Sequence, residues 1–219
     1  VDLHWVAPLS CGFLTGYGTV VNGLKPKTAS SIVIFGTGAV GLSALMATKI
    51  EGYTTIIAFD IHDSRLELAK ELGATHMINS LKEDVVERVR EITNGMGVHY
   101  SVDTTGVSAV MKAGVDVLGM NGVFAPIAVT PNTLEINTSQ DFVPMNRTVI
   151  GVLMEDAIPQ LTILQLIQYY QEGKFPIDKL IKFYKFKDIN QATAGSNSGK
   201  TIKPILIIDE DYRKDNPLV

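Results

Sequence analysis

Short runs of β-branched and other apolar residues alternate with longer polar and apolar stretches over most of the chain. Each run has the length of a buried strand and is bounded by glycine or polar residues. The intervening stretches repeat their apolar residues at helical spacing. The predicted strands are Ile32–Phe35, Thr55–Phe59, His76–Ile78, Tyr100–Val102, Gly122–Ile127 and Thr148–Val152.

The helices expected between these strands have recognisable starts and stops. Asp63 is predicted to cap a helix that stops at Gly73. Ser80 followed by Glu83 has the spacing of a capping box, which predicts another helix start. The predicted helices are Val40–Ile50, Asp63–Leu72, a segment through Val85–Ile92, a segment through Val110–Leu118, and one from Pro159 to about Glu172.

Alternation of strand and helix predicts an α/β fold with a parallel sheet covered on both faces. Right-handed crossovers then give a doubly wound sheet of six strands. The alternation weakens after residue 127, where Leu134–Asn137 is at most a short strand. The last apolar run, Ile202–Ile208, contains Pro204 and is therefore expected on a sheet edge or at a bulge.

The strongest motif follows the first predicted strand and opens the first long helix: Gly36-Thr37-Gly38-Ala39-Val40-Gly41. In a G-x-G-x-x-G loop the first glycine permits the tight turn and the second lets the backbone approach a pyrophosphate. The third lets the helix pack closely on the strand. N–H groups at the helix start attract the phosphate charge. The motif predicts a dinucleotide site in a Rossmann fold.

Asp60 follows the second predicted strand, at the position from which a carboxylate accepts hydrogen bonds from the adenosine ribose hydroxyls. The same carboxylate would repel a 2′-phosphate, so NAD is expected in preference to NADP. Taken alone, Asp60 also fits a helix cap or a solvated loop residue. Arg65 lies five positions further on and would either contact the ribose or lend tolerance to a phosphate.

Composition narrows the function classes. The 219 residues are 46% hydrophobic and carry a formal net charge of −4, so no broad positive field favours nucleic acid. No apolar run approaches the roughly 18 residues of a membrane span. The single cysteine, Cys11, excludes an internal disulfide framework and predicts a reducing, cytoplasmic location. The chain begins with Val, which leads us to expect a piece of a longer protein.

Several stretches together resemble the C-terminal part of the zinc-dependent medium-chain alcohol dehydrogenases, most of all the bacterial enzymes for primary or aromatic alcohols. The resemblance covers essentially the whole chain, and the combination is specific although no single stretch is. The stretches that carry it are 7–18 (APLSCGFLTGYG), Gly36–Gly41 with Asp60, 71–75 (ELGAT), 102–106 (VDTTG), 173–176 (GKFP) and 198–204 (SGKTIKP).

This resemblance implies roles for further residues, each of which also has an ordinary structural interpretation. Cys11 matches the last cysteine ligand of the catalytic zinc, whose other ligands have no match in this sequence. Lys203 matches a residue that reaches the pyrophosphate. Pro126 departs from the family pattern and removes one N–H donor beside the carboxamide site. The remaining matched positions are Thr15 and Val40 at the nicotinamide, Ile61 and Thr105 around adenosine, and Ile127 and Val129 at the carboxamide.

The resemblance divides the chain into a catalytic-domain remnant (1–13), an NAD-binding Rossmann domain (14–156) and a return segment (157–219), so that remnants of a GroES-like domain flank the sheet. It implies hydride transfer between an alcohol and NAD in the full-length enzyme, with zinc as Lewis acid. No proton-relay residue is identified. We expect this chain to bind NAD without turnover, and to form a homodimer or homotetramer through the sheet edge. Two alternatives stay open: an oligomerising module, and a zinc-free reductase of the quinone reductase type, against which Cys11 argues.

Overall fold

The computed structural model describes residues 3–154 and 158–209. The chain divides into two compact units, which are described separately. The sheet unit is Thr15–Ala157, and the terminal unit combines Val1–Leu14 with Ile158–Val219. Within the described residues, none of the helices combines the length and apolar character needed to cross a bilayer.

The sheet unit contains one six-stranded sheet in the order β3-β2-β1-β4-β5-β6, in which every neighbouring pair is parallel. Strand order therefore reverses between β1 and β4, as in a doubly wound sheet. The predicted fold class is confirmed. The strands are β1 (Ser31–Phe35), β2 (Thr55–Asp60), β3 (His76–Asn79), β4 (Val98–Asp103), β5 (Leu118–Pro126) and β6 (Thr148–Val149).

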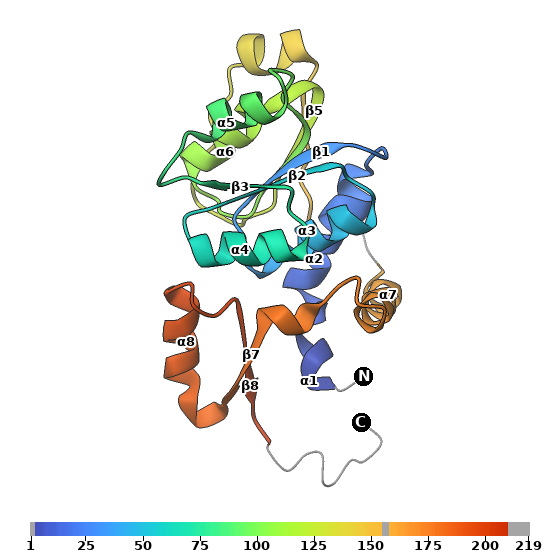
Figure 1. The fold of residues 1–219 in the computed structure, drawn as a ribbon, viewed down its shortest axis with the longest axis vertical. Coiled ribbons are helices and arrows are strands. Elements are labelled where there is room, and N and C mark those ends of the chain that lie inside the picture. The colour runs from blue at the N-terminus through green and yellow to red at the C-terminus, as the bar shows by residue number, and fades with distance from the viewer. Residues whose placement is uncertain (1–2, 155–157, 210–219) are drawn as a thin grey trace. The chain divides into compact units, whose positions relative to one another are not determined.

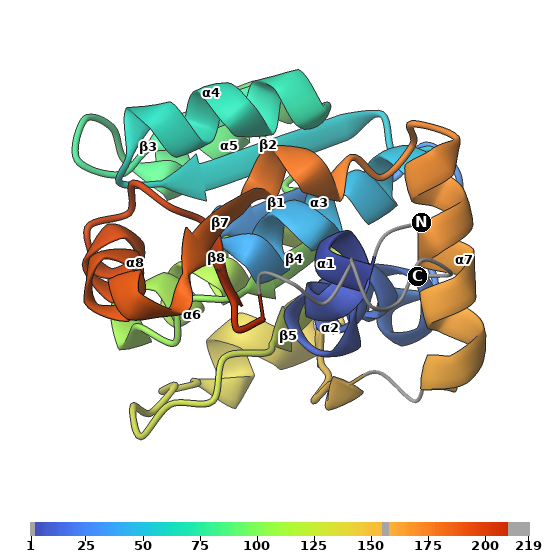
Figure 2. The same ribbon diagram turned by 90° about the horizontal axis from the view of Figure 1, so that it is seen from below.

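Helices cover both faces of this sheet: α3 and α4 lie on one face, and α5 and α6 lie on the other (Figures 1 and 2). The central strand β1 is buried along its whole length, because both of its faces are covered. The helices of this unit are α2 (Gly12–Gly18, which begins in the terminal unit), α3 (Ala39–Ile50), α4 (Asp63–Leu72), α5 (Val85–Ile92) and α6 (Ser108–Asp116), with shorter turns η2 (Thr19–Leu24), η3 (Thr138–Phe142) and η4 (Val143–Met145).

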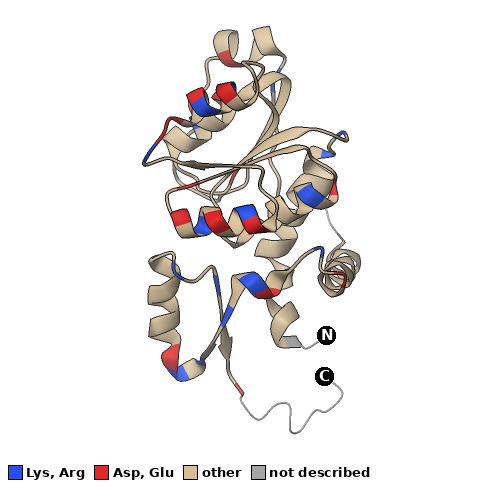
Figure 3. Cartoon of the chain, viewed as in Figure 1, with Lys and Arg blue, Asp and Glu red and all other residues tan. Residues whose placement is uncertain are grey.

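An apolar core lies between the sheet and the α5–α6 face. Phe35 of β1 and Phe59 of β2 place their rings 4.9 Å apart, and Val89 of α5 and Val115 of α6 are fully buried in the same cluster. Acidic and basic residues are interspersed along α4 and α5 (Figure 3). The helices are therefore amphipathic, and their apolar faces pack on the sheet.

The terminal unit contains a second sheet, in which β7 (Ile181–Lys185) pairs in parallel with β8 (Lys203–Ile207). In a two-stranded sheet both strands are edges, so Pro204 lies on an edge strand as predicted. The remaining elements are α1 (Leu3–Val6), α7 (Pro159–Gln171), α8 (Ile189–Asn197), and the turns η1 (Ala7–Ser10), η6 (Ile177–Leu180) and η7 (Phe186–Asp188).

Two predicted helix caps were wrong. Helix α4 takes His62 as its N-cap residue, because the Asp63 side chain instead binds Asn79 Nδ2 at 2.6 Å and Lys82 Nζ at 2.7 Å. Helix α5 is capped by Asp84, whose Oδ1 accepts a 2.9 Å hydrogen bond from the Glu87 N–H. The Ser80–Glu83 segment forms the preceding turn.

Strand predictions from the fifth strand onward were also partly wrong. Residues 134–137 form no strand: Leu134 is partly buried, but Ile136, the other apolar residue of the segment, is exposed and packs on no neighbouring strand. The sixth strand is shorter than the predicted Thr148–Val152, since only Thr148 and Val149 pair with β5. Strand β5 begins earlier than expected, at Leu118, which was assigned to the preceding helix.

Candidate functional site

The glycine loop connects β1 to α3 at the point where the strand order reverses. Gly36 has φ +88°, a conformation that favours glycine, and a Cβ on it would lie 2.4 Å from Thr104 Oγ1. A Cβ on Gly41 would lie 1.8 Å from the Gly36 carbonyl oxygen, so the helix approaches the loop as closely as glycine allows. Gly38, in contrast, faces open space: nothing lies within 4 Å of its would-be Cβ.

Asp60 ends β2 beside this loop, and its buried carboxylate organises the loop. Oδ2 accepts hydrogen bonds from the Thr37 N–H at 2.8 Å and the Thr37 hydroxyl at 2.7 Å. Oδ1 accepts the N–H groups of Ile61 at 2.8 Å and His62 at 3.0 Å. Arg65 approaches from α4, with its Nη1 3.9 Å from Oδ2.

These contacts keep Asp60 ionised. Burial by itself would raise the pKa of Asp60, but hydrogen bonds from Thr37 and His62 and the positive charge of Arg65 outweigh it. The pKa therefore lies below its ordinary value. Asp60 is only 6% exposed, so a charged acceptor is held at the base of the site at neutral pH.

A second polar turn follows β4 and faces the glycine loop. The fully buried Asp103 accepts hydrogen bonds from the Thr105 hydroxyl at 2.7 Å and from the Gly106 N–H at 2.9 Å. Thr104 Oγ1 donates to the Phe35 carbonyl oxygen at 2.8 Å, which joins the turn to the end of β1. Two buried aspartates thus shape the loops at the carboxyl ends of β2 and β4, the strands on either side of β1.

Between these loops lies a cavity of about 340 Å³, within the usual range for ligand pockets. Its walls come from the ends of β1, β2 and β4 and the starts of the helices that follow, which is where open α/β sheets bind ligands. The lining residues are Gly36, Gly38, Phe59, Asp60, Ile61, His62, Arg65, Ser80, Thr104, Thr105, Val107 and Val110.

A comparison with protein families identifies the family to which this chain belongs. The model of the zinc-binding dehydrogenase family matches residues 39–170, which is more than half of the chain. The chain belongs to the zinc-binding dehydrogenase family. This family member is 35% identical to a geraniol dehydrogenase of Castellaniella defragrans over 214 residues, covering 94% of this chain and 56% of that protein.

Solved structures agree with this membership. The crystal structure of benzyl alcohol dehydrogenase from Acinetobacter calcoaceticus matches with a TM-score of 0.92 and 45% identity, over 95% of this chain and 58% of that one. An alcohol dehydrogenase zinc-binding domain protein from Burkholderia ambifaria matches with a TM-score of 0.90 and 46% identity, over 94% and 56% of the two chains. The chain spans about half the length of the curated relatives it matches.

The structure brings part of the predicted site of this family member together. Gly36, Gly38, Asp60 and Arg65 line one cavity. Ile61 and Thr105, the predicted adenosine neighbours, line the same cavity, and 49% of Ile61 is exposed. Thr15 in α2 and Ala39 and Val40 at the start of α3 are half-buried and lie outside the lining residues.

The residues predicted to contact the nicotinamide carboxamide, Ile127 and Val129, lie outside the cavity lining. Ile127 follows β5 directly, but its N–H already donates to the Asp103 carbonyl oxygen at 2.9 Å. Val129 is fully exposed. With Pro126 lacking an N–H, the end of β5 therefore offers fewer donors than the family resemblance implies.

Cys11 and Lys203 belong to the terminal unit. Cys11 is exposed and makes no disulfide, and Lys203 begins β8. Within residues 3–154 and 158–209, no group of three or more His, Cys, Asp and Glu side chains is placed to hold a metal. A catalytic zinc needs three protein ligands, so the described residues do not by themselves fit one.

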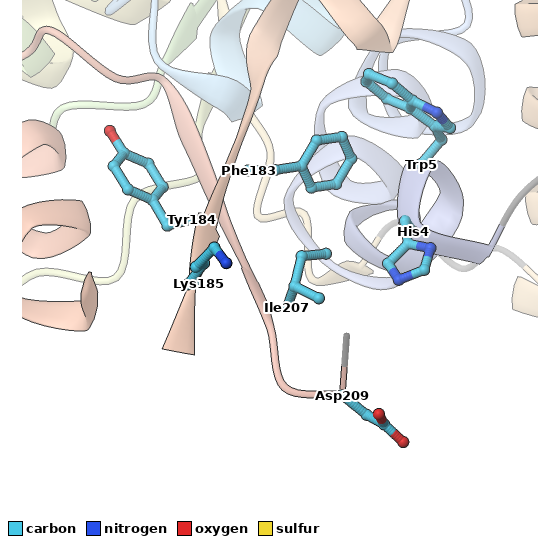
Figure 4. Close-up of a pocket in the computed structure, with 7 residues that line it drawn as sticks. All are labelled: His4, Trp5, Phe183, Tyr184, Lys185, Ile207 and Asp209. Atoms are coloured by element: carbon cyan, nitrogen blue, oxygen red, sulfur yellow. The ribbon is translucent and has the colours of Figure 1, made fainter. Parts of the chain in front are cut away.

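Another cavity, of about 590 Å³, lies within the terminal unit (Figure 4). The Phe183 ring points toward Trp5, with their centroids 4.7 Å apart, whereas Tyr184 points to the other side of β7. The Tyr184 hydroxyl instead shares a buried 2.8 Å hydrogen bond with Thr201 Oγ1. None of the predicted site residues lines this cavity, whose walls are His4, Trp5, Phe183, Tyr184, Lys185, Ile207 and Asp209.

Sequence reasoning missed several residues that line the cavity beside the glycine loop. His62 supplies a backbone N–H to Asp60, and its position two residues after the strand-ending aspartate is the signal that would have identified it. Phe59, Ser80, Val107 and Val110 contribute surface with no motif to mark them. The bond between the Thr37 hydroxyl and Asp60 was also not foreseen, because it joins two separate loops.

Proposed function

We propose that this chain is the NAD-binding portion of an alcohol dehydrogenase that transfers hydride between a primary or aromatic alcohol and NAD. The observation that carries the proposal is the cavity in which an ionised Asp60 lies beside the open backbone at Gly38. The names of its relatives, among them geraniol dehydrogenase and benzyl alcohol dehydrogenase, support the substrate class.

The residues present fit a dinucleotide. The Gly38 backbone has space for a pyrophosphate, and the N–H groups at the start of α3 face it with partial positive charge. Asp60 would accept the ribose hydroxyls, with Ile61, Thr105 and Arg65 around the adenosine. Val40 and Thr15 would lie toward the nicotinamide, with Ile127 and Val129 beyond it. Bound NAD would supply the hydride acceptor, while this chain orients it.

We propose NAD in preference to NADP on electrostatic grounds. A 2′-phosphate would enter beside a carboxylate that is buried and ionised. Like charges at such short range repel strongly in a partly desolvated pocket. Arg65 favours the opposite preference, since its guanidinium would offer a partner to a phosphate, but its Nη1 already faces Asp60.

Turnover by this chain alone is not expected. Cys11 is proposed as one zinc ligand of the full-length enzyme, and the residues described here supply no set of partners for it. Lys203 is proposed to reach the pyrophosphate, and its segment and residues 1–13 to belong to the catalytic domain. Hydride transfer by the full-length protein would therefore need further zinc ligands, for which the sequence of this chain has no matching residues.

A second proposed function is self-association through the edge of the sheet. Strand β6 pairs with β5 on one side, and both of its residues, Thr148 and Val149, are exposed. An unpaired parallel edge of this kind invites pairing with a second copy. We propose that the sheet unit forms a homodimer, or part of a homotetramer, through β6. Size-exclusion chromatography with and without NAD tests this, because a monomer in both conditions would contradict it.

The cofactor proposal is tested by calorimetric titration of the 219-residue chain with NADH. Binding is expected for the unmodified chain. Gly38→Ala adds a methyl group where the pyrophosphate is expected and should weaken binding roughly tenfold or more. Gly151→Ala is the matched control, since its Cβ also meets nothing within 4 Å but lies outside the cavity.

Two results would contradict the proposal. The first is the absence of binding heat at millimolar NADH. The second is equal binding by Gly38→Ala and the unmodified chain, which would place the pyrophosphate elsewhere. Oxidation of benzyl alcohol by this chain, followed as NADH absorbance, would refute the separate expectation that it lacks turnover.

A further inference from the structure

Ser80 lines the cavity beside the glycine loop, and its hydroxyl differs from the two threonine hydroxyls of the same lining. The Thr104 hydroxyl donates to the Phe35 carbonyl oxygen at 2.8 Å. The Thr105 hydroxyl donates to Asp103 Oδ1 at 2.7 Å. For the Ser80 hydroxyl, the described part of the chain provides no hydrogen-bond partner. Ser80 is partly exposed, so a molecule in the cavity can reach this hydroxyl.

The backbone fixes the position of Ser80 within the cavity. Ser80 directly follows β3, whose last residue, Asn79, pairs with Asp60 at the end of β2. The Ser80 N–H donates to the Asp60 carbonyl oxygen at 3.2 Å. The Asn79 side chain donates to Asp63 Oδ1 at 2.6 Å, which ties the end of β3 to the start of α4. Ser80 is therefore held next to Asp60, one strand further from the glycine loop.

Strand order sets the sequence of groups along the carboxyl edge of the sheet. Strands β3, β2 and β1 are neighbours in that order, so Ser80, Asp60 and the glycine loop follow one another along the edge. In a dinucleotide the adenine base, its ribose and the pyrophosphate follow one another in the same way. In the proposed function the pyrophosphate lies at Gly38 and the ribose at Asp60, so the base extends past Asp60 toward Ser80.

The chemistry of a serine hydroxyl suits the edge of an adenine base. The six-membered ring of adenine carries two acceptor nitrogens, N1 and N3, and a donor amino group. A serine hydroxyl both donates and accepts, and it turns about one side-chain bond, so it can pair with either kind of group. The side chains of Ile61, Val107 and Val110 also line the cavity, but they offer only apolar contact to the base.

We propose that the Ser80 hydroxyl hydrogen-bonds the six-membered ring of the adenine base, which makes Ser80 a specificity residue of the cofactor site. This inference rests on the proposed function, in which a dinucleotide occupies the cavity with its ribose at Asp60. Because the described residues provide no partner that this hydroxyl must give up, the bond to the base replaces only a contact with water. A hydrogen bond of this kind contributes about fivefold in affinity.

The experiment measures dissociation constants for NADH, AMP and benzimidazole riboside 5′-monophosphate, the last two by displacement of NADH fluorescence. The benzimidazole nucleotide keeps the bicyclic shape, the ribose and the phosphate, but its six-membered ring has no nitrogen and no amino group. Ser80→Ala should weaken the binding of NADH and AMP about fivefold. It should leave the affinity for the benzimidazole nucleotide within about twofold of wild type, because that ligand offers the hydroxyl no partner on this ring.

Two control variants and a stability measurement accompany this comparison. Ser80→Thr retains a hydroxyl and should keep the wild-type preference for AMP over the benzimidazole nucleotide. Ser139→Ala removes an exposed serine hydroxyl outside the cavity lining and should change none of the three affinities. Thermal unfolding of Ser80→Ala should match wild type, because the hydroxyl bonds to none of the described residues.

Three results would overturn the inference while leaving the proposed function intact. The first is equal binding of AMP by Ser80→Ala and wild type. The second is an equal loss for AMP and the benzimidazole nucleotide, since Ser80 would then shape the cavity without contacting the polar groups of the base. The third needs no variant: it is equal affinity of the wild-type chain for these two nucleotides. A wild-type chain that binds neither NADH nor AMP would refute the proposed function itself, and this inference with it.

Discussion

The sheet unit and the terminal unit use their polar residues in different ways. In the sheet unit, a buried aspartate follows each of two strands and organises the loop beside it: Asp60 holds the glycine loop, and Asp103 holds the turn after β4. In the terminal unit the buried polar pair, Tyr184 and Thr201, ties two segments of the same unit together. Its candidate functional residues, Cys11 and Lys203, are by comparison exposed or only partly buried.

The residues that line the cavity beside the glycine loop all belong to the sheet unit. This unit therefore positions the residues proposed for the ribose and the glycine loop proposed for the pyrophosphate, whereas Lys203, a further proposed pyrophosphate contact, belongs to the terminal unit. The zinc site implied by the family is represented by one thiol, and three ligands are needed. The predictions below test whether cofactor binding depends on the sheet unit alone.

The largest effect is expected at Asp60. Asp60→Ala removes the charged acceptor proposed for the ribose and leaves the Thr37 N–H and hydroxyl without their partner, so NADH binding should weaken by roughly 10- to 100-fold. Asp178→Ala, an exposed aspartate in the terminal unit, is the control and should leave NADH binding unchanged. Fluorescence titration with NADH measures both. A comparable loss in the two variants would break the distinction between the units.

Gly41→Ala should destabilise the sheet unit. Its Cβ would lie 1.8 Å from the Gly36 carbonyl oxygen, so the helix start must move away from the loop. Such overpacking typically costs about 1–3 kcal/mol in the free energy of unfolding. Urea unfolding followed by far-UV circular dichroism measures the change against Gly151→Ala, whose Cβ meets no neighbour within 4 Å. Equal stability of the two variants would show that the loop and helix are not tightly packed.

Tyr184→Phe should act on the terminal unit only. Losing the buried bond to Thr201 should cost about 1 kcal/mol of that unit's stability, with NADH affinity unchanged. Trp5 is the chain's single tryptophan and packs on Phe183 in the terminal unit, so its fluorescence reports unfolding there. Weaker NADH binding by this variant would show that the cofactor site depends on both units.

The smallest effect concerns pH. The folded-state pKa of Asp60 lies below its ordinary value, so this carboxyl contributes stability above its unfolded pKa of about 3.9. That contribution is lost as the pH falls through the folded pKa. Unfolding free energies measured from pH 6 to pH 3 should therefore decline less steeply in Asp60→Asn than in wild type. Identical slopes would mean that Asp60 is not held ionised by its neighbours.

The sequence predicted the elements that depend on local pattern. Six strands, their order of appearance and the helices between them follow from apolar periodicity, and the G-x-G-x-x-G loop was placed correctly between β1 and α3. Local reasoning was less successful at the helix starts. Ser80 and Asp84 both fit a capping pattern, and only the position of the chain after β3 selects Asp84.

What the sequence determined by itself is a doubly wound α/β fold with a glycine loop and an acidic residue at the end of the second strand. The tertiary structure decided which groups meet. It directs the Thr37 hydroxyl at Asp60, uses the Ile127 N–H within the fold, and brings the turn after β4 against the glycine loop. Periodicity reports which face of an element is buried, whereas these contacts join residues far apart in sequence and depend on strand order and register.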